Sequence, residues 1–310
     1  MLVVKIGGGA ALNLEAICAD IARLVAWDEQ VVVVHGGSGE MDLISERLGR
    51  PARIVTSPSG VQSRYTDRET MEIFTMVVAG RVNKMLVERL QQKGVNALGL
   101  SGLDGRLLEG KRKGTIIAVE NGRKKVLRDD YGGTVERVNV PLLHLLLAQG
   151  FTPVVAPVAI SEEGEALNVD GDRVAAAIAG ALRARALVIL SGVPGLLRDF
   201  PDERTVIPSI PGDQVGMYQE YARGKMKKKL LGAEEALRHG VRRVILADGR
   251  GEQPVLRALA EGNGTVIWAT TSERPPHPSP AACGGFPLPS PDLWSGEGRG
   301  LGGGVRTPLP

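Results

Sequence analysis

Short apolar runs rich in β-branched residues alternate with helical patterns along most of this chain, and this alternation limits the folds open to it. Several runs are apolar at consecutive positions, as expected of strands that are covered on both faces. Alternating strands and helices predict an α/β fold in which a mainly parallel sheet lies between layers of helices. The six predicted strands span residues 2–6, 31–34, 96–100, 152–156, 186–190 and 243–247.

The helices between these strands carry start and stop signals. Asn13 is suited to cap a helix that reaches about Trp27, and Asn139 precedes a helix with Pro141 in its first turn. A long helix is expected to end just before Gly94. That helix spans residues 68–92, and two further helices are predicted over 172–183 and 226–239.

One segment departs from the alternation and predicts a β-hairpin. Residues 115–119 and 124–127 flank Asn121-Gly122, which is a strong turn signal between two strands. We therefore expect a ribbon that projects from the sheet. Its positive charge is usually explained by solvated surface, and a lid or a docking face for an acidic partner is the alternative. The basic residues are Lys111, Arg112, Lys113, Arg123, Lys124, Lys125 and Arg128.

The composition excludes several classes of protein. Lysine and arginine number 38 against 35 acidic residues, and no basic run is interleaved with aromatic residues as in a single-strand nucleic-acid binder. Cys18 and Cys283 are too few for a metal cluster and fit a reducing compartment. No basic-then-apolar leader and no run of roughly 18 apolar residues is present. We expect a soluble cytoplasmic protein without a membrane or nucleic-acid partner.

The end of the chain has a different composition. Residues 271–310 hold 9 of the 19 prolines and 8 of the 41 glycines and show no periodicity. Such a segment buries too little apolar surface to offset its ordering entropy, so residues 269–310 are predicted to be a disordered tail.

Two glycine-rich turns follow the first two predicted strands, and each leads into a helix. They are Gly7-Gly8-Gly9 and His35-Gly36-Gly37-Ser38-Gly39. Glycine lets backbone amides approach an anion closely, and a helix N-terminus adds a favourable dipole. The chain contains neither a P-loop nor a complete Rossmann fingerprint. Together with Lys5 at the end of the first strand, the turns favour phosphate binding over a purely structural use of glycine.

Three further places hold polar groups that could serve a site. Arg64 precedes a helix start; on its own a surface arginine is the favoured explanation, and recognition of a carboxylate by its guanidinium is the alternative. One of Asn168, Asp170 and Asp172 suffices to cap the apolar helix that follows them. Four lysines in RGKMKKKL, residues 223–230, oppose the dipole of the helix they begin and therefore favour a bound anion.

These features resemble the amino acid kinase family, and the acetylglutamate kinase branch most closely, over about residues 1–268. They occur in the family's order: Lys5 with Gly7-Gly8, His35-Gly36-Gly37, Arg64, Asn168 with Asp172, LVILSGVPGLL, and Lys228. Within that branch, SRYTDRET, LNVDGD, VPGLLRDFPDE and GKMKKKLLGAEEA are most similar to kinases that act on α-aminoadipate attached to the carrier protein LysW, in bacterial lysine biosynthesis.

The resemblance implies an open αβα sandwich, with an acyl-acceptor lobe at residues 1–180 and an ATP lobe at 181–268. It implies a catalytic set, an acceptor-binding set and an ATP-binding set. The catalytic set is Lys5, Lys228 and Asp172. The acceptor-binding set is Gly36, Gly37, Arg64 and Asn168. The ATP-binding set is Gly7, Gly8, Ser191, Gly195 and Gly224. Lys228 is chosen by counting four residues from Gly224, so Lys225, Lys227 and Lys229 stay open. Gly192 departs from the Asp or Asn that many relatives carry, so a side-chain contact to nucleotide is lost there.

The implied chemistry needs ATP, with Mg²⁺ held by the nucleotide phosphates, and no general base, because a carboxylate is already ionised at pH 7. An acidic carrier protein and a second copy of the chain are the implied partners. Acetylglutamate and carrier-linked glutamate remain alternative acceptors, since one methylene or a different blocking group is worth only about 1–3 kcal/mol in a pocket. A non-catalytic sensor of amino acids or nucleotides is the alternative from another class.

Overall fold

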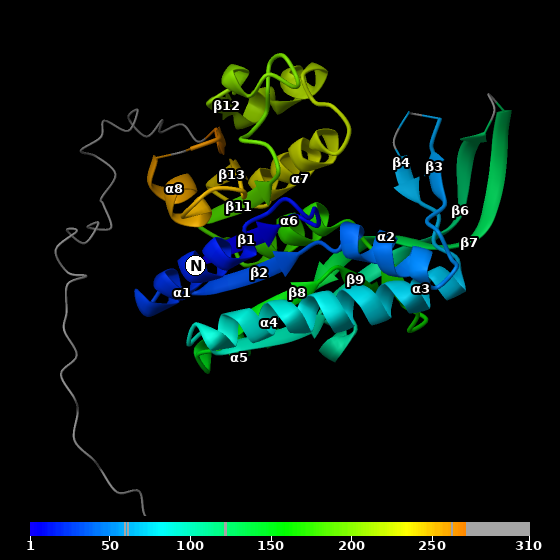
Figure 1. The fold of residues 1–310 in the computed structure, drawn as a ribbon, viewed down its shortest axis with the longest axis horizontal. Helices are drawn as coiled ribbons and strands as arrows, with labels where there is room; N and C mark the ends of the chain where they lie inside the picture. The colour runs from blue at the N-terminus through cyan, green and yellow to red at the C-terminus, as the bar shows by residue number, and fades with distance from the viewer. Residues whose placement is uncertain (59, 61, 121–122, 262, 271–310) are drawn as a thin grey trace, which may run out of the picture. The chain divides into compact units, whose positions relative to one another are not determined.

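A computed structural model describes residues 1–58, 60, 62–120, 123–261 and 263–270 of the chain (Figure 1). The predicted turn at Asn121-Gly122 and nearly all of the predicted tail lie outside these residues. No helix in the described part of the chain is long and apolar enough to cross a membrane.

The centre of the fold is an eight-stranded, mainly parallel sheet, as predicted. Every neighbouring pair in it is parallel except β13 with β14. All six predicted strands are present, with bounds that differ by at most one residue at either end. In sheet order the strands are β12 (Ser209–Pro211), β14 (Thr265–Trp268), β13 (Arg243–Asp248), β11 (Ala186–Ser191), β1 (Leu2–Ile6), β2 (Val31–His35), β8 (Thr152–Ala156) and β5 (Ala97–Ser101).

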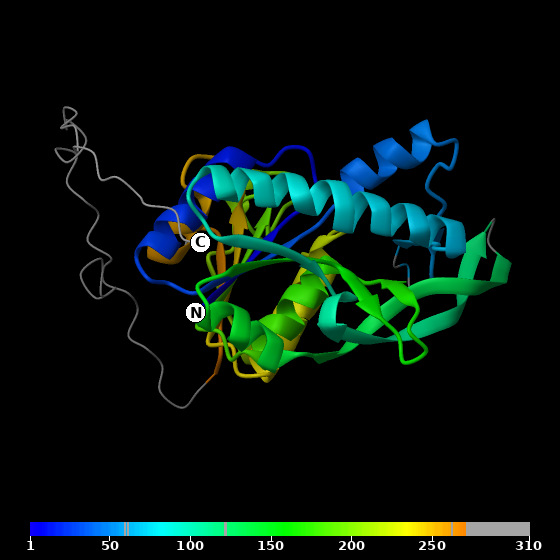
Figure 2. The same cartoon turned by 90° about the horizontal axis from the view of Figure 1, so that it is seen from below.

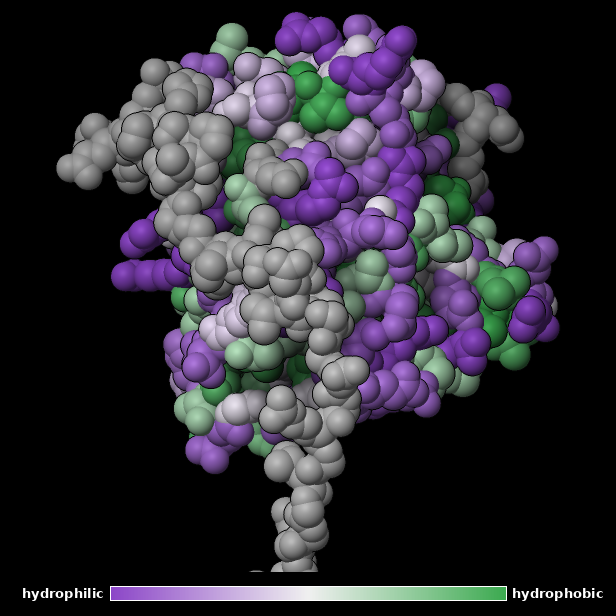
Figure 3. Space-filling model, turned by 60° about the vertical axis from the view of Figure 1, so that its left-hand side comes forward, coloured by the Kyte–Doolittle hydropathy of each residue, from purple (hydrophilic) through white to green (hydrophobic). Residues whose placement is uncertain are grey.

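Helices cover both faces of this sheet, so the predicted three-layer arrangement is confirmed (Figures 1 and 2). On one face, α5 (Val140–Ala148), α6 (Gly171–Ala181) and α7 (Met226–Arg238) complete one apolar core. On the other face, α1 (Leu14–Ala26), α4 (Asn83–Gln92) and α8 (Pro254–Glu261) complete a second. Figure 3 shows apolar side chains in small patches among polar ones on one side of the molecule, as expected when the large apolar clusters are internal.

The predicted caps form. The Asn13 side chain accepts a hydrogen bond from the amide of Ala16 at 3.1 Å, and that of Asn139 accepts one from Leu142 at 3.2 Å. Asp170 caps α6 by accepting from the amide of Asp172 at 2.9 Å. The start of α6 is therefore fixed by Asp170, which leaves the Asp172 carboxylate available for other contacts.

The predicted long helix is continuous but irregular. It consists of α3 (Arg68–Phe74), a π-helical segment (Thr75–Val82) and α4, and Figure 2 shows it running along one side of the molecule. The segment between α3 and α4 buries Val77 and Val78. A π-helical turn is rare and is often found at functional sites.

The predicted ribbon is present and longer than expected. Its strands are β6 (Leu108–Glu120) and β7 (Arg123–Val138), which pair antiparallel up to Glu120 opposite Arg123. A second hairpin, β3 (Ile54–Thr56) with β4 (Gln62–Arg64), packs against it through Val55, Ala118 and Leu127 (Figure 1). At its base the ribbon joins β9 (Val158–Ile160) and β10 (Ala166–Asn168) in a small closed barrel.

Candidate active site

The two glycine-rich turns pack backbone against backbone where β1 and β2 end. The Gly36 amide donates to the Ile6 carbonyl at 2.8 Å, and the Gly39 amide donates to the Gly8 carbonyl at 3.0 Å. A Cβ built on Gly8 would lie 2.7 Å from Gly37 N, and one on Gly36 would lie 2.7 Å from Gly8 N. Only glycine fits so close an approach, which brings the amides of both turns together.

Beside these turns, one carboxylate joins two lysines in the interior. Lys5 Nζ at the end of β1 lies 2.8 Å from Asp172 Oδ1. Lys229 Nζ on α7 lies 3.2 Å from Asp172 Oδ1 and 3.1 Å from Oδ2. All three side chains are less than a tenth exposed. Lys229 reaches Asp172 because α6 packs closely on α7. A Cβ on Gly232 of α7 would lie only 3.3 Å from the Asp172 carbonyl oxygen.

The charges of this cluster depend on one another. Burial alone would raise the pKa of Asp172, but the ammonium groups of Lys5 and Lys229 outweigh it and hold that pKa well below its usual range. The pKa of Lys229 is lowered by burial and by Lys5, with Asp172 opposing both effects. An ionised carboxylate between two ammonium groups leaves one positive charge uncompensated, which suits an anion in front of the cluster.

The structure places Lys229, and not Lys228, in this cluster. Lys228 Nζ lies 3.6 Å from Asp170 Oδ2 at the surface, with a third of its side chain exposed. Because α7 begins at Met226, its buried positions include 229, 230, 233 and 236. Counting from Gly224 missed this by one residue. The apolar spacing of Leu230, Ala233 and Ala236 was the signal that could have selected Lys229.

Arg64 presents an unpaired donor beside the helix that follows the second glycine turn. Its Nη2 forms an ion pair with Asp42 on α2 (Ser38–Arg47), and only a tenth of the side chain is exposed. Its Nη1 is buried and has no hydrogen-bond partner among the residues that the structure describes. A buried guanidinium nitrogen without a partner is costly unless a ligand supplies an acceptor.

Asn168 is held near the same place by a chain of buried polar groups. Its Nδ2 donates to Thr66 Oγ1 at 3.0 Å, and the Thr66 amide donates to Asp130 Oδ1 at 3.0 Å. Burial raises the pKa of Asp130, against the lowering effect of amides that donate to it. Sequence reasoning gave no site role to Asp42, Thr66 or Asp130, because each acts through a partner distant in the sequence.

The residues predicted to bind ATP lie at the ends of β1 and β11 and before α7. The Gly7 amide donates to the Leu190 carbonyl at 3.1 Å, which joins the first glycine turn to the loop that begins at Ser191. A Cβ on Gly195 would lie 2.6 Å from Thr265 Oγ1, so this loop is packed tightly on β14. Gly224 has φ +52° and open space around it, directly before α7. No cluster of three or more metal-ligating side chains occurs within the described ranges.

Comparisons with known proteins agree on one family. The sequence profile described as "Amino acid kinase family" matches residues 1–248. The chain is 56% identical to the [LysW]-aminoadipate kinase of Deinococcus radiodurans, over 86% of this chain and 91% of that protein. It is 52% identical to the [LysW]-aminoadipate kinase of Thermus thermophilus, over 86% and 100%. Among solved structures, N-acetylglutamate synthase from Neisseria gonorrhoeae complexed with coenzyme A and N-acetyl-glutamate has a TM-score of 0.69 and 25% identity, over 87% of this chain and 59% of that one.

Proposed function

The chain belongs to the amino acid kinase family, and on that premise we propose that it transfers the γ-phosphoryl group of ATP to the side-chain carboxylate of LysW-linked α-aminoadipate. The names of relatives that are 52% and 56% identical support the acceptor. The observation that carries the chemistry is the buried cluster of Lys5, Asp172 and Lys229 beside two glycine turns. The product would be an acyl phosphate in lysine biosynthesis.

The cluster fits phosphoryl transfer to a carboxylate. The acceptor is ionised at pH 7 and needs no base, so catalysis consists of alignment and compensation of charge on the moving group. We propose Lys5 and Lys229, in place of Lys228, as the lysines that stabilise that charge, with Asp172 holding both. ATP would bring Mg²⁺ on its phosphates.

The remaining site residues divide by position. We propose that Arg64, Asn168, Gly36 and Gly37 bind the acceptor within a lobe of residues 1–180. Within a lobe of residues 181–268, the nucleotide would contact Ser191, Gly195 and Gly224, with Gly7 and Gly8 facing its phosphates. The unpaired Arg64 Nη1 supports a carboxylate ligand on the acceptor side.

The test is an ADP-release assay with three acceptors: carrier-linked aminoadipate, carrier-linked glutamate and free N-acetylglutamate. We expect the highest kcat/KM with carrier-linked aminoadipate. A higher value with either other acceptor would assign the chain to arginine biosynthesis. ADP release with none of the three would overturn the kinase proposal and favour a ligand sensor.

Replacing Arg64 with lysine is expected to raise KM for the acceptor about 10- to 100-fold, because one charge-assisted hydrogen bond is worth about 1.5–3 kcal/mol. Initial-rate measurements at varied acceptor concentration check this. Arg68→Lys is the matched control, since Arg68 is exposed, pairs with Glu72 on its own helix face, and contacts the Tyr131 ring at 5.7 Å, where a lysine keeps the positive charge. Equal KM values in the two variants would remove Arg64 from the acceptor site.

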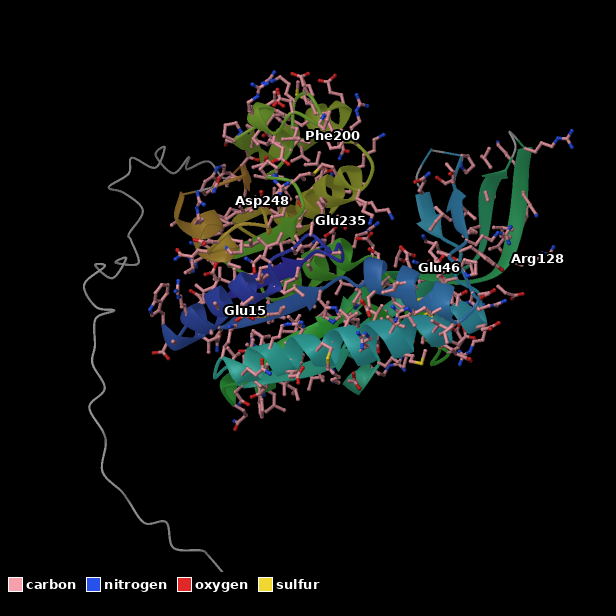
Figure 4. The ribbon with its side chains drawn as sticks, in the orientation of Figure 1. Glu15, Glu46, Arg128, Phe200, Glu235 and Asp248 are labelled. Carbon is pink, nitrogen blue, oxygen red and sulfur yellow. The ribbon has the colours of Figure 1, made fainter. Side chains whose placement is uncertain are left out.

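The basic ribbon is the proposed docking face for the acidic carrier. Figure 4 shows Arg128 on this ribbon, far from Glu235 on α7 and from Asp248. Neutralising Lys124 and Lys125 together should raise KM for the carrier-linked acceptor in a salt-dependent way and leave KM for ATP unchanged. Arg183→Gln with Arg242→Gln is the control. These exposed residues precede β11 and β13, so they lie at the amino ends of parallel strands, whereas the glycine turns lie at the carboxyl ends. Equal effects of both pairs would contradict docking on the ribbon.

We also propose a cytoplasmic homodimer formed through the long helix, which the family resemblance implies. Met76 and Met85 on this helix are 55% and 39% exposed. Light scattering coupled to gel filtration should give twice the chain mass. Met76→Glu with Met85→Glu should give a monomer if this helix forms the interface.

A further inference from the structure

His35 is a buried histidine that the proposed reaction does not use directly. It is the last residue of β2, directly before the Gly36-Gly37 turn, and is 1% exposed. Its Nδ1 lies 2.9 Å from the Gly36 carbonyl oxygen, and its Nε2 lies 3.0 Å from Asn83 Nδ2 at the start of α4. Both ring nitrogens therefore have polar partners, one of them on the backbone of the acceptor turn.

The second partner fixes which nitrogen carries the proton. Asn83 Nδ2 also lies 2.9 Å from the Val154 carbonyl oxygen, and only a donor suits that contact. The same NH2 group must then donate to His35 Nε2, so Nε2 is the acceptor and Nδ1 carries the hydrogen. A protonated ring would turn two donors toward each other at Asn83. Burial, with Lys5 and Lys84 nearby, lowers the pKa of His35 to about 4 against the raising effect of the Gly36 contact, so the ring is neutral.

The proton on Nδ1 has a consequence for the next peptide group. It donates to the Gly36 carbonyl, and in a planar trans peptide the following N–H points in the opposite direction. The Gly37 amide is thereby turned away from His35. It lies at the contact between the two glycine turns, 2.7 Å from the position of a Cβ on Gly8. Gly36 and Gly37 lack a Cβ that would limit this peptide, so the histidine restricts a bond that glycine leaves free.

We propose that His35, held in one tautomer by Asn83, is a positioning residue that aims the Gly37 amide at the reacting anion. This inference rests on the proposed carboxylate kinase function for its kinetic consequences. The anion is the acceptor carboxylate or the phosphoryl group moving to it, and both accept hydrogen bonds from an amide. Asn83 extends the arrangement to the long helix, whose Val78 also packs against Gly37: a Cβ on Gly37 would lie 3.0 Å from Val78 Cγ2.

The tautomer can be tested on the wild-type protein without a substrate. Long-range ¹H–¹⁵N correlation spectra of the histidine rings should show His35 protonated at Nδ1 only, with shifts that do not change between pH 6 and 8. His35→Asn assigns the signal among the four histidines. A ring protonated at Nε2, or one that titrates in this range, would overturn the proposal.

Two variants separate positioning from space filling. His35→Asn keeps a donor near the Nδ1 position, whereas His35→Gln moves the amide toward the Nε2 position and loses the Gly36 contact. We expect kcat/KM to fall less than about 5-fold in the first and on the order of 100-fold in the second, as for misplaced catalytic groups. Equal losses would show that His35 only fills space. If the wild type phosphorylates no acceptor, the proposed function fails and the spectra still decide the tautomer.

Discussion

Replacing Lys229 with methionine is expected to lower kcat by about 100-fold or more, while Lys228→Met lowers it by no more than a few-fold. The buried ammonium of Lys229 is 3.1 Å from Asp172, so it is fixed before the reaction begins. Removal of one such preorganised electrostatic contact typically costs two to three orders of magnitude in kcat. Lys5→Met is expected to have an effect of the same size, since the buried ammonium of Lys5 lies 2.8 Å from the same carboxylate.

The two neighbouring lysines form a matched pair, because the substitutions are chemically identical and adjacent on one helix. Single-turnover rates at saturating ATP and acceptor measure the effect on chemistry, and circular dichroism melts exclude unfolding as its cause. A larger loss in Lys228→Met than in Lys229→Met would return the role to Lys228. Near-normal kcat in Lys5→Met would refute the role proposed for the first strand.

Asp172→Asn is expected to lower the free energy of unfolding by about 3–5 kcal/mol and to reduce kcat strongly. Removing one member of a buried ionic group leaves the others uncompensated, and two ammonium groups would then face each other in the interior. The pKa of Asp172 is depressed in the folded state, so its contribution to stability is present above its unfolded pKa of about 3.9. That contribution is lost as the pH falls below this value toward the folded pKa.

Urea unfolding between pH 3 and 7 measures both effects. The wild type should lose more stability than Asp172→Asn as the pH falls from about 4 to 3, so the gap between the two curves narrows at the acidic end of this range. Asp170→Asn is the control, because asparagine still caps α6 and the ion pair that Asp170 loses is with Lys228, a third of whose side chain is exposed. If Asp172→Asn and Asp170→Asn were equally stable at pH 7, the buried cluster of Asp172 with its two lysines would not stabilise the fold.

The central strands were predictable because each is a short β-branched run covered on both faces, so hydrophobic pattern and burial agree. Residues 2–6 and 152–156 match β1 and β8 at both ends. β12 escaped prediction because its three residues end at Pro211 and, among the strands that the structure describes, pair only with β14. The pairing of β12 with β14 depends on tertiary contacts that local sequence patterns do not encode.

The site was predictable where a backbone requirement leaves a mark in the sequence. Glycines in close contact and a lysine ending an apolar strand are such marks. Asp42 and Asn83 left none, because an acidic or amide residue on a helix normally indicates solvent exposure. Only the fold brings Asp42 to Arg64, 22 residues away, and Asn83 to His35, 48 residues away.

Because it contains a π-helical segment, the long helix should tolerate substitutions there but not insertions or deletions. An α-helix advances about 100° per residue. Deleting one residue between Thr75 and Val82 could restore regular winding, and everything downstream would rotate by roughly that angle. Asn83 would then lose its contact with His35 on β2, and the exposed side chain of Met85 would rotate away from its present direction. Among relatives that keep the function, deletions in this stretch should therefore be rarer than substitutions.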